Sequence, residues 1–97
     1  MPNARSEPVS EDAIRLWCVA YLARALRLRP EGIDHDQDFA GLGLDSAESI
    51  FMVTAAEDWL NLELDSETAI QHPNVTAFSR FLMSLLRQQG RATPAQS

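Results

Sequence analysis

The stretch GLGLDS, residues 41–46, marks the point where an irregular, acidic segment turns into a helix. The next fourteen residues, AESIFMVTAAEDWL, contain neither glycine nor proline. Asp45 is expected to cap this helix, and Glu48 at the third helical position completes an Asp-x-x-Glu form of the capping box. Ser46 is therefore predicted to be the first residue of a helix over 46–60.

A first helix is predicted over residues 10–28, with Ser10 as its N-cap and Pro30 as its stop signal. Its apolar residues recur at spacings of three and four, which predicts a single buried stripe made of Ile14, Trp17, Cys18, Tyr21, Ala25 and Leu28. Residues 29–43 then form a long loop. Three apolar anchors, Ile33, Phe39 and Leu42, are expected to pin this loop across the helices.

Residues beyond the second helix predict two further helices. Asn61 is suited to end the second helix because asparagine tolerates left-handed geometry. The side of this helix expected to be buried is made of Ile50, Val53, Ala56 and Leu60. A short turn over 67–71 and a last helix from Asn74 to near Gly90 follow, the latter burying Val75, Phe78, Phe81, Leu82 and Leu85. The predicted fold is an all-α four-helix bundle with three long helices, one short helix and a long first loop.

Length and composition indicate one small domain. The chain has 97 residues, of which 45% are hydrophobic and 23% charged, as in globular proteins. Residues 10–89 are predicted to be the domain, with flexible tails at 1–9 and 90–97, which lack apolar periodicity. A single cysteine, Cys18, excludes an internal disulfide and favours the cytoplasm. No signal peptide and no stretch long enough to span a membrane is recognised.

Charge is distributed unevenly along the chain. The net charge is −6, and residues 31–67 hold eleven of the fourteen acidic residues and no lysine or arginine. Such a segment repels phosphate backbones, so nucleic acid is not expected as a partner. A basic protein partner fits better.

The pattern F-x-x-L-G-L-D-S at residues 39–46, between two helices of a small helical domain, resembles the acyl carrier protein family, which includes polyketide and peptidyl carrier domains. HPNV at 72–75 is similar to the start of the last helix of these carriers. The resemblance implies that Ser46 receives 4′-phosphopantetheine from coenzyme A and that acyl intermediates are held as thioesters on its thiol. EDWL at 57–60 favours carriers of polyketide or nonribosomal-peptide biosynthesis over those of primary fatty-acid synthesis.

An enzyme acting through Ser46 is not predicted, because a serine nucleophile needs a paired base and an oxyanion site. Only two histidines are present, His35 and His72, and neither forms a recognisable catalytic pattern. His35 lies among Asp34, Asp36 and Asp38, but this spacing matches no known ligand set, so no metal site is predicted. Taken alone, Ser46 is equally an ordinary first residue of a capped helix.

Partner recognition is predicted to involve Asp45, Ala47, Glu48, Phe51, Met52, Glu57 and Asp58. The acids would meet basic residues, and an exposed Phe51 beside Met52 would add an apolar contact. Whether Phe51 and Trp59 are buried or exposed stays open. The resemblance implies a phosphopantetheinyl transferase, an acyl-loading enzyme and a synthase such as a ketosynthase as partners of a monomer. The alternatives left open are a helical interaction module that is not modified, and a free-standing protein or an excised domain.

Overall fold

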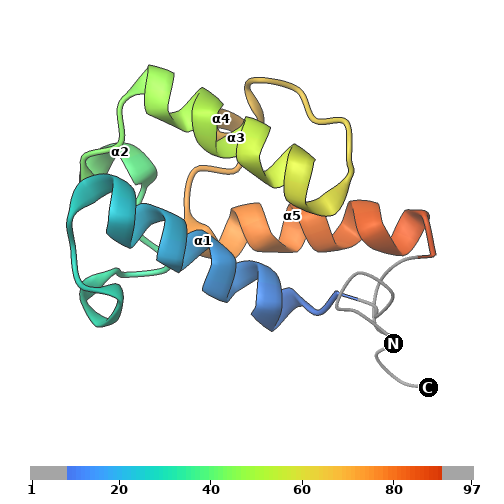
Figure 1. Cartoon of the computed structure of the whole chain (residues 1–97), viewed down its shortest axis with the longest axis horizontal. Helices are drawn as coiled ribbons and strands as arrows, with labels where there is room; N and C mark the ends of the chain where they lie inside the picture. The colour runs from blue at the N-terminus through green and yellow to red at the C-terminus, as the bar shows by residue number, and fades with distance from the viewer. Residues whose placement is uncertain (1–8, 91–97) are drawn as a thin grey trace.

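The structure, a computed structural model, describes residues 9–90, and its regular elements are helices (Figure 1). The long helices are α1 (Glu11–Leu26), α3 (Ser46–Leu60) and α5 (Val75–Gln88). The short elements are the 3₁₀ turn η2 (Pro30–Gly32) and the helices α2 (Phe39–Leu42) and α4 (Thr68–Gln71). α1 packs against α5, and α4 lies against α3.

The predicted all-α bundle is confirmed, with η2 and α2 as additions within the loop that was predicted over 29–43. α3 has the predicted bounds, and α4 and α5 lie where the sequence places them. The predicted tails lie outside the described residues, apart from Val9 and Gly90. No helix in the described part of the chain is both long and apolar enough to cross a membrane.

Side-chain caps begin the long helices, and left-handed residues end two of them. The Ser10 hydroxyl accepts the Ala13 N–H at 3.1 Å, as expected of an N-cap. α1 ends at Leu26, two residues earlier than predicted, because Arg27 adopts the left-handed conformation (φ 58°) and terminates the helix. Asn61 ends α3 in the same conformation (φ 54°), as its residue type predicts.

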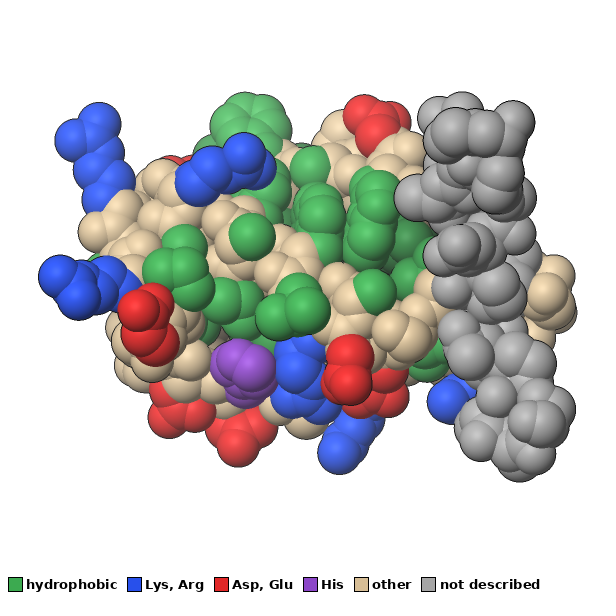
Figure 2. All heavy atoms as spheres, turned by 60° about the horizontal axis from the view of Figure 1, so that its bottom comes forward, with side chains coloured by type: hydrophobic (Ala, Val, Ile, Leu, Met, Phe, Trp, Pro, Cys, Tyr) green, Lys and Arg blue, Asp and Glu red, His purple; other side chains and the backbone are tan. Residues whose placement is uncertain are grey.

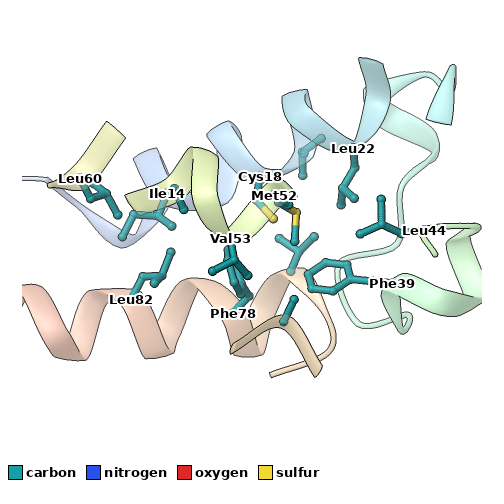
Figure 3. Packing of buried hydrophobic residues seen from close by; sticks show 14 of the residues in the cluster. Ile14, Cys18, Leu22, Phe39, Leu44, Met52, Val53, Leu60, Phe78 and Leu82 are labelled. Atoms are coloured by element: carbon teal, nitrogen blue, oxygen red, sulfur yellow. The ribbon is translucent and has the colours of Figure 1, made fainter. Parts of the chain in front are cut away.

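One hydrophobic core joins the three long helices (Figure 3). Figure 3 shows side chains of α1, α3 and α5 directed toward one another, with Phe39 and Leu44 at one end of the cluster. Phe39 meets Phe78 edge to face, with ring centroids 5.9 Å apart. The core therefore extends to the segment that leads into Ser46.

Some of the residues predicted to face the core are half-buried or exposed. In α1 the buried residues are Ile14, Cys18, Val19, Leu22 and Ala23. Trp17 and Tyr21 are half-buried, whereas Ala25 and Leu28 are exposed, and Leu28 lies beyond the end of α1. In α3 the prediction of Ile50 as a core residue is wrong, since its side chain is exposed and Met52 is buried instead. In α5, Val75, Phe78 and Leu82 are buried as predicted, together with Met83 and Leu86, while Phe81 and Leu85 are half-buried.

The loop between α1 and α3 is attached to the start of α5. The Phe39 N–H donates to the Pro73 carbonyl at 2.7 Å, and the Thr76 N–H donates to the His35 carbonyl at 3.1 Å. The Thr76 hydroxyl also donates to the Asp36 carboxylate at 2.8 Å. Ile33 and Phe39 are buried, as predicted for anchors, and Leu42 is half-buried. These contacts hold the loop across the bundle.

Cys18 lies in the core and is fully buried. Burial raises the pKa of its thiol from 9.0 to about 12, because the thiolate would lose its hydration inside the apolar core. The thiol is therefore protonated at neutral pH and unreactive.

Candidate functional site

Ser46 is the first residue of α3, at the end of a tight change of chain direction (Figure 1). Gly43 ends α2 with φ 112°, a conformation that residues with a Cβ rarely adopt. Leu44 then enters the core, where only 3% of its surface is exposed. The chain leaves the core again directly afterwards, and both Asp45 and Ser46 are exposed. A buried leucine thus fixes the position of an exposed serine.

Asp45 and Glu48 cap α3 reciprocally, as the sequence predicts. The Asp45 carboxylate accepts the Glu48 N–H at 2.8 Å, and the Glu48 carboxylate accepts the Asp45 N–H at 3.3 Å. The Ser49 N–H and hydroxyl both donate to the Asp45 carbonyl, at 2.9 and 3.0 Å. Ser46 takes no part in the cap, and its hydroxyl has no hydrogen-bond partner among residues 9–90.

The start of α3 fits a phosphodiester on the Ser46 oxygen. The N–H groups of Ser46 and Ala47 have no acceptor within residues 9–90, and they lie at the positive end of the helix dipole. Such a position favours an anion by about 0.3–1 kcal/mol. The carboxylates of Asp45 and Glu48 oppose this attraction. A covalently attached phosphodiester does not depend on it, because it needs only the exposed Ser46 oxygen and the free N–H groups beside it.

The predicted recognition residues do not all lie on the surface. Asp45, Ala47, Phe51 and Asp58 are exposed, and Glu48 and Glu57 are half-buried. The Glu57 carboxylate accepts the Leu64 N–H at 2.7 Å and so holds the connector to α3. The prediction of Met52 as a contact residue is wrong, because its side chain is fully buried beneath α3.

Phe51 is 64% exposed, which answers the question left open by its position on α3. Two further apolar residues that were not predicted to be exposed also lie at the surface, Ile50 on α3 and Ile70 on the neighbouring α4. An isoleucine in the polar segment DSETAIQ was a signal for Ile70, because α4 is too short to bury every apolar residue it carries. These three side chains supply apolar surface on α3 and α4.

Trp59 is neither fully buried nor fully exposed. It is 40% exposed, and its ring stacks on Trp17 of α1 with centroids 5.2 Å apart and an interplanar angle of 12°. Its ring therefore belongs to the contact between α1 and α3 rather than to the surroundings of Ser46.

Both histidines are engaged elsewhere. His35 Nδ1 lies 3.3 Å from the Arg15 guanidinium, and the His72 ring stacks on Phe81 with centroids 4.1 Å apart. Neither hydrogen-bonds to Ser46 among the described residues. The same part of the chain contains no group of three histidine, cysteine or acidic residues placed to hold a metal ion.

A family model described as a phosphopantetheine attachment site matches residues 17–82. The chain is similar to the acyl carrier protein TtuC of Teredinibacter turnerae, with 23% identity over 74 residues that cover 76% of this chain and 85% of that protein. It is also similar to a conidial yellow pigment biosynthesis polyketide synthase of Emericella nidulans, with 36% identity over 64 residues. That match covers 66% of this chain, which spans only 3% of the length of the synthase.

Two solved structures are similar. The first is a free-standing peptidyl carrier protein from a secondary metabolic pathway of Acinetobacter baumannii, with a TM-score of 0.75 and 30% identity over 79% of this chain and 96% of that chain. The second is the HMG-ACPI domain from the CurA module of Lyngbya majuscula, with a TM-score of 0.76 and 27% identity over 93% and 90% of the two chains. The predicted carrier fold is therefore confirmed.

Proposed function

Because this chain belongs to the phosphopantetheine attachment family, whose members carry a covalently bound 4′-phosphopantetheine group, we propose that Ser46 is its attachment residue. The proposed role is that of an acyl carrier protein in polyketide or mixed peptide–polyketide biosynthesis. The relatives support this class of pathway, since they include a polyketide synthase and carriers of secondary metabolism.

One observation carries the assignment of Ser46. Its hydroxyl is exposed at the start of a long helix, and the cap of that helix is supplied by Asp45 and Glu48. The oxygen is thus available for a phosphodiester bond without loss of the cap. The ordinary role that the sequence left open for Ser46, the first residue of a helix capped by Asp45, makes no use of its hydroxyl.

The chain's own residues position the hydroxyl and present a surface. The Ser46 oxygen would form a phosphodiester bond with the phosphopantetheinyl phosphorus of coenzyme A, while the pyrophosphate bond breaks and adenosine 3′,5′-bisphosphate leaves. The serine proton would pass to a base of the transferase, since neither His35 nor His72 is available to it. The attached group supplies a thiol on which acyl groups are carried as thioesters. Gly43 and Leu44 fix the direction in which Ser46 points. The chain alone is expected to show no turnover.

Partner enzymes are proposed to approach the α3 side of the molecule. Asp45, Glu48 and Asp58 would attract Arg and Lys on a transferase, a loading enzyme or a ketosynthase, chiefly by speeding association. Phe51 supplies the exposed apolar contact at this surface. Glu57 contributes its charge, although one carboxylate oxygen is held by Leu64. Ala47, next to Ser46, leaves room at the attachment point because its side chain is small.

The test is modification of the full chain by a broad-specificity phosphopantetheinyl transferase with coenzyme A, followed by intact-mass measurement. We expect a gain of one phosphopantetheinyl group per chain. Ser46→Ala is expected to abolish the gain. The matched control is Ser66→Ala, because Ser66 is exposed and is also preceded by Leu-Asp.

Loss of modification in Ser66→Ala but not in Ser46→Ala would contradict the assignment. An unmodified wild-type chain would instead favour an interaction module that needs no prosthetic group.

A further inference from the structure

A hollow of about 460 Å³ lies along α1, apart from the residues around Ser46. Its walls come from α1 and the segment that follows it: Trp17, Ala20, Tyr21, Ala23, Arg24, Leu28 and Pro30. A space of this volume accommodates a large side chain or a small ligand. The carrier role proposed above makes no use of this hollow.

Aromatic rings stiffen one wall of the hollow. The Trp17 ring stacks on Trp59, and its centroid lies 5.5 Å from that of the Tyr21 ring. Its position is therefore fixed by contacts with both α1 and α3. Ala20 is exposed and small, which leaves the space beside these rings open. Leu16 is 71% exposed and Leu28 40% exposed. Figure 2 shows hydrophobic side chains gathered across the middle of one side of the molecule.

Positive charge is concentrated at the end of α1 where the hollow lies. Arg24, Arg27 and Arg29 are exposed, and none of them forms an ion pair within residues 9–90. The arginines that are paired in this range are Arg15 and Arg80, both with Glu11. Residues 24–31 contain three arginines and one glutamate, a net charge of +2 in a chain whose total is −6. Basic side chains flank the hydrophobic area on one side in Figure 2.

From this shape and charge we propose that the hollow on α1 is a docking site for an acidic amphipathic segment of a partner protein. The segment places a large apolar side chain between Trp17 and Leu28 and sets carboxylates against Arg24, Arg27 and Arg29. Tryptophan, tyrosine and arginine are the residues that dominate binding energies in protein interfaces. Three separate guanidinium groups suit several carboxylates along a segment better than one small anion.

This surface is opposite in charge to the one around Ser46. Partners of the α3 side are expected to be basic, whereas a partner of the α1 hollow must be acidic. The two surfaces therefore select partners of opposite charge. The proposal does not depend on modification of Ser46.

The experiment is an NMR titration of the isotope-labelled full chain with a synthetic amphipathic helical peptide that carries leucines on one side and glutamates on the other. The control peptide has lysine at every glutamate position. We expect the glutamate peptide alone to shift the amide signals of α1 and the indole signal of Trp17. Added salt is expected to weaken the binding, because the charges lie at the surface.

Two variants sharpen the test. Arg24→Glu is expected to weaken binding about tenfold, and Ala20→Trp is expected to weaken it at unchanged charge by filling the hollow. Arg87→Glu is the matched control, since Arg87 is exposed on α5, and it is expected to bind as the wild type does.

Equal binding of both peptides, absence of binding, signal shifts confined to α3, or wild-type affinity in Arg24→Glu and Ala20→Trp would each overturn the proposal. So would sedimentation showing that the wild-type chain is a dimer and that Ala20→Trp converts it to a monomer.

Discussion

The tripeptide Leu-Asp-Ser occurs twice in the chain, at residues 44–46 and at 64–66, and both serines are exposed. The aspartates differ in what they bind. Asp45 accepts the N–H of Glu48, three residues on, and caps the 15-residue helix α3. Asp65 accepts the N–H of Glu67, two residues on, in a turn before the four-residue helix α4. Only the first serine therefore lies on the end of a long helix.

The residues before the two tripeptides differ as well. Leu44 is buried and follows Gly43, whose φ of 112° turns the chain out of α2. Leu64 is half-buried, and its N–H is bound to the Glu57 carboxylate. The comparison teaches that the tripeptide itself does not define the site. A glycine turn, a buried anchor and a long capped helix together distinguish Ser46 from Ser66.

The largest effect on stability is expected at the turn before the first tripeptide. Gly43→Ala places a Cβ on a residue with φ 112°, so it should lower the free energy of unfolding by about 1–3 kcal/mol. Gly32→Ala is the control, because its φ is ordinary and nothing lies within 4 Å of an added Cβ. Urea denaturation followed by circular dichroism measures both. Equal stability of the two variants would show that the turn at Gly43 is not strained by a side chain.

A smaller effect is expected from removing the two aspartate side chains. Asp45→Ala should lower the free energy of unfolding by about 1 kcal/mol, because it removes the cap of a long helix. Asp65→Ala should cost less, since its turn precedes only four helical residues. Asp45→Asn retains an acceptor oxygen and should restore most of the loss. Thermal unfolding is a suitable measurement, and a larger loss in Asp65→Ala would contradict the distinction drawn between the two segments.

The smallest effect on stability is expected at the serines. Ser46→Ala and Ser66→Ala should each change the free energy of unfolding by less than about 0.5 kcal/mol, because both side chains are exposed. The same denaturation experiment measures them. A marked loss in Ser46→Ala alone would mean that its hydroxyl has a structural role, and its loss of modification would then need another explanation.

Helix ends could be predicted from the sequence because local chemistry determines them. Ser10, Asp45 and Asn74 are capping residues that bind N–H groups three residues on, an interaction that needs no distant partner. The left-handed end at Asn61 is equally local. The end of α1 was missed because Arg27 is not a residue type that ordinarily adopts a positive φ.

Which face of each helix is buried could be predicted less well, because apolar residues occur on more than one side. α1 presents both Trp17 and Leu22, and only tertiary packing decides that Leu22 is fully buried while Trp17 is half-buried. α3 presents both Ile50 and Met52, and the sequence reading selected Ile50 for the core. The short elements η2 and α2 were missed because three or four residues are too few for a periodic pattern.

The position of Ser46 at the start of α3 could be predicted because the capping residues and the following helix are contiguous in the sequence. The exposure of Ile50 on α3 and Ile70 on α4 could not, because tertiary packing decides which apolar residues stay at the surface. The hollow on α1 was also beyond sequence reasoning, since Trp17 and Tyr21 look like ordinary core residues there. Their rings are instead half-buried and form its wall.

The hydrogen bonds from Phe39 to Pro73 and from Thr76 to His35 have a consequence for synthesis on the ribosome. The segment that leads into Ser46 gains these contacts only after the start of α5 has emerged from the exit tunnel. A nascent chain that ends before Pro73 exposes the same serine without the two hydrogen bonds that hold the preceding segment. A transferase that acts as proposed on Ser46 would therefore meet the supported segment only after nearly the whole domain has been translated.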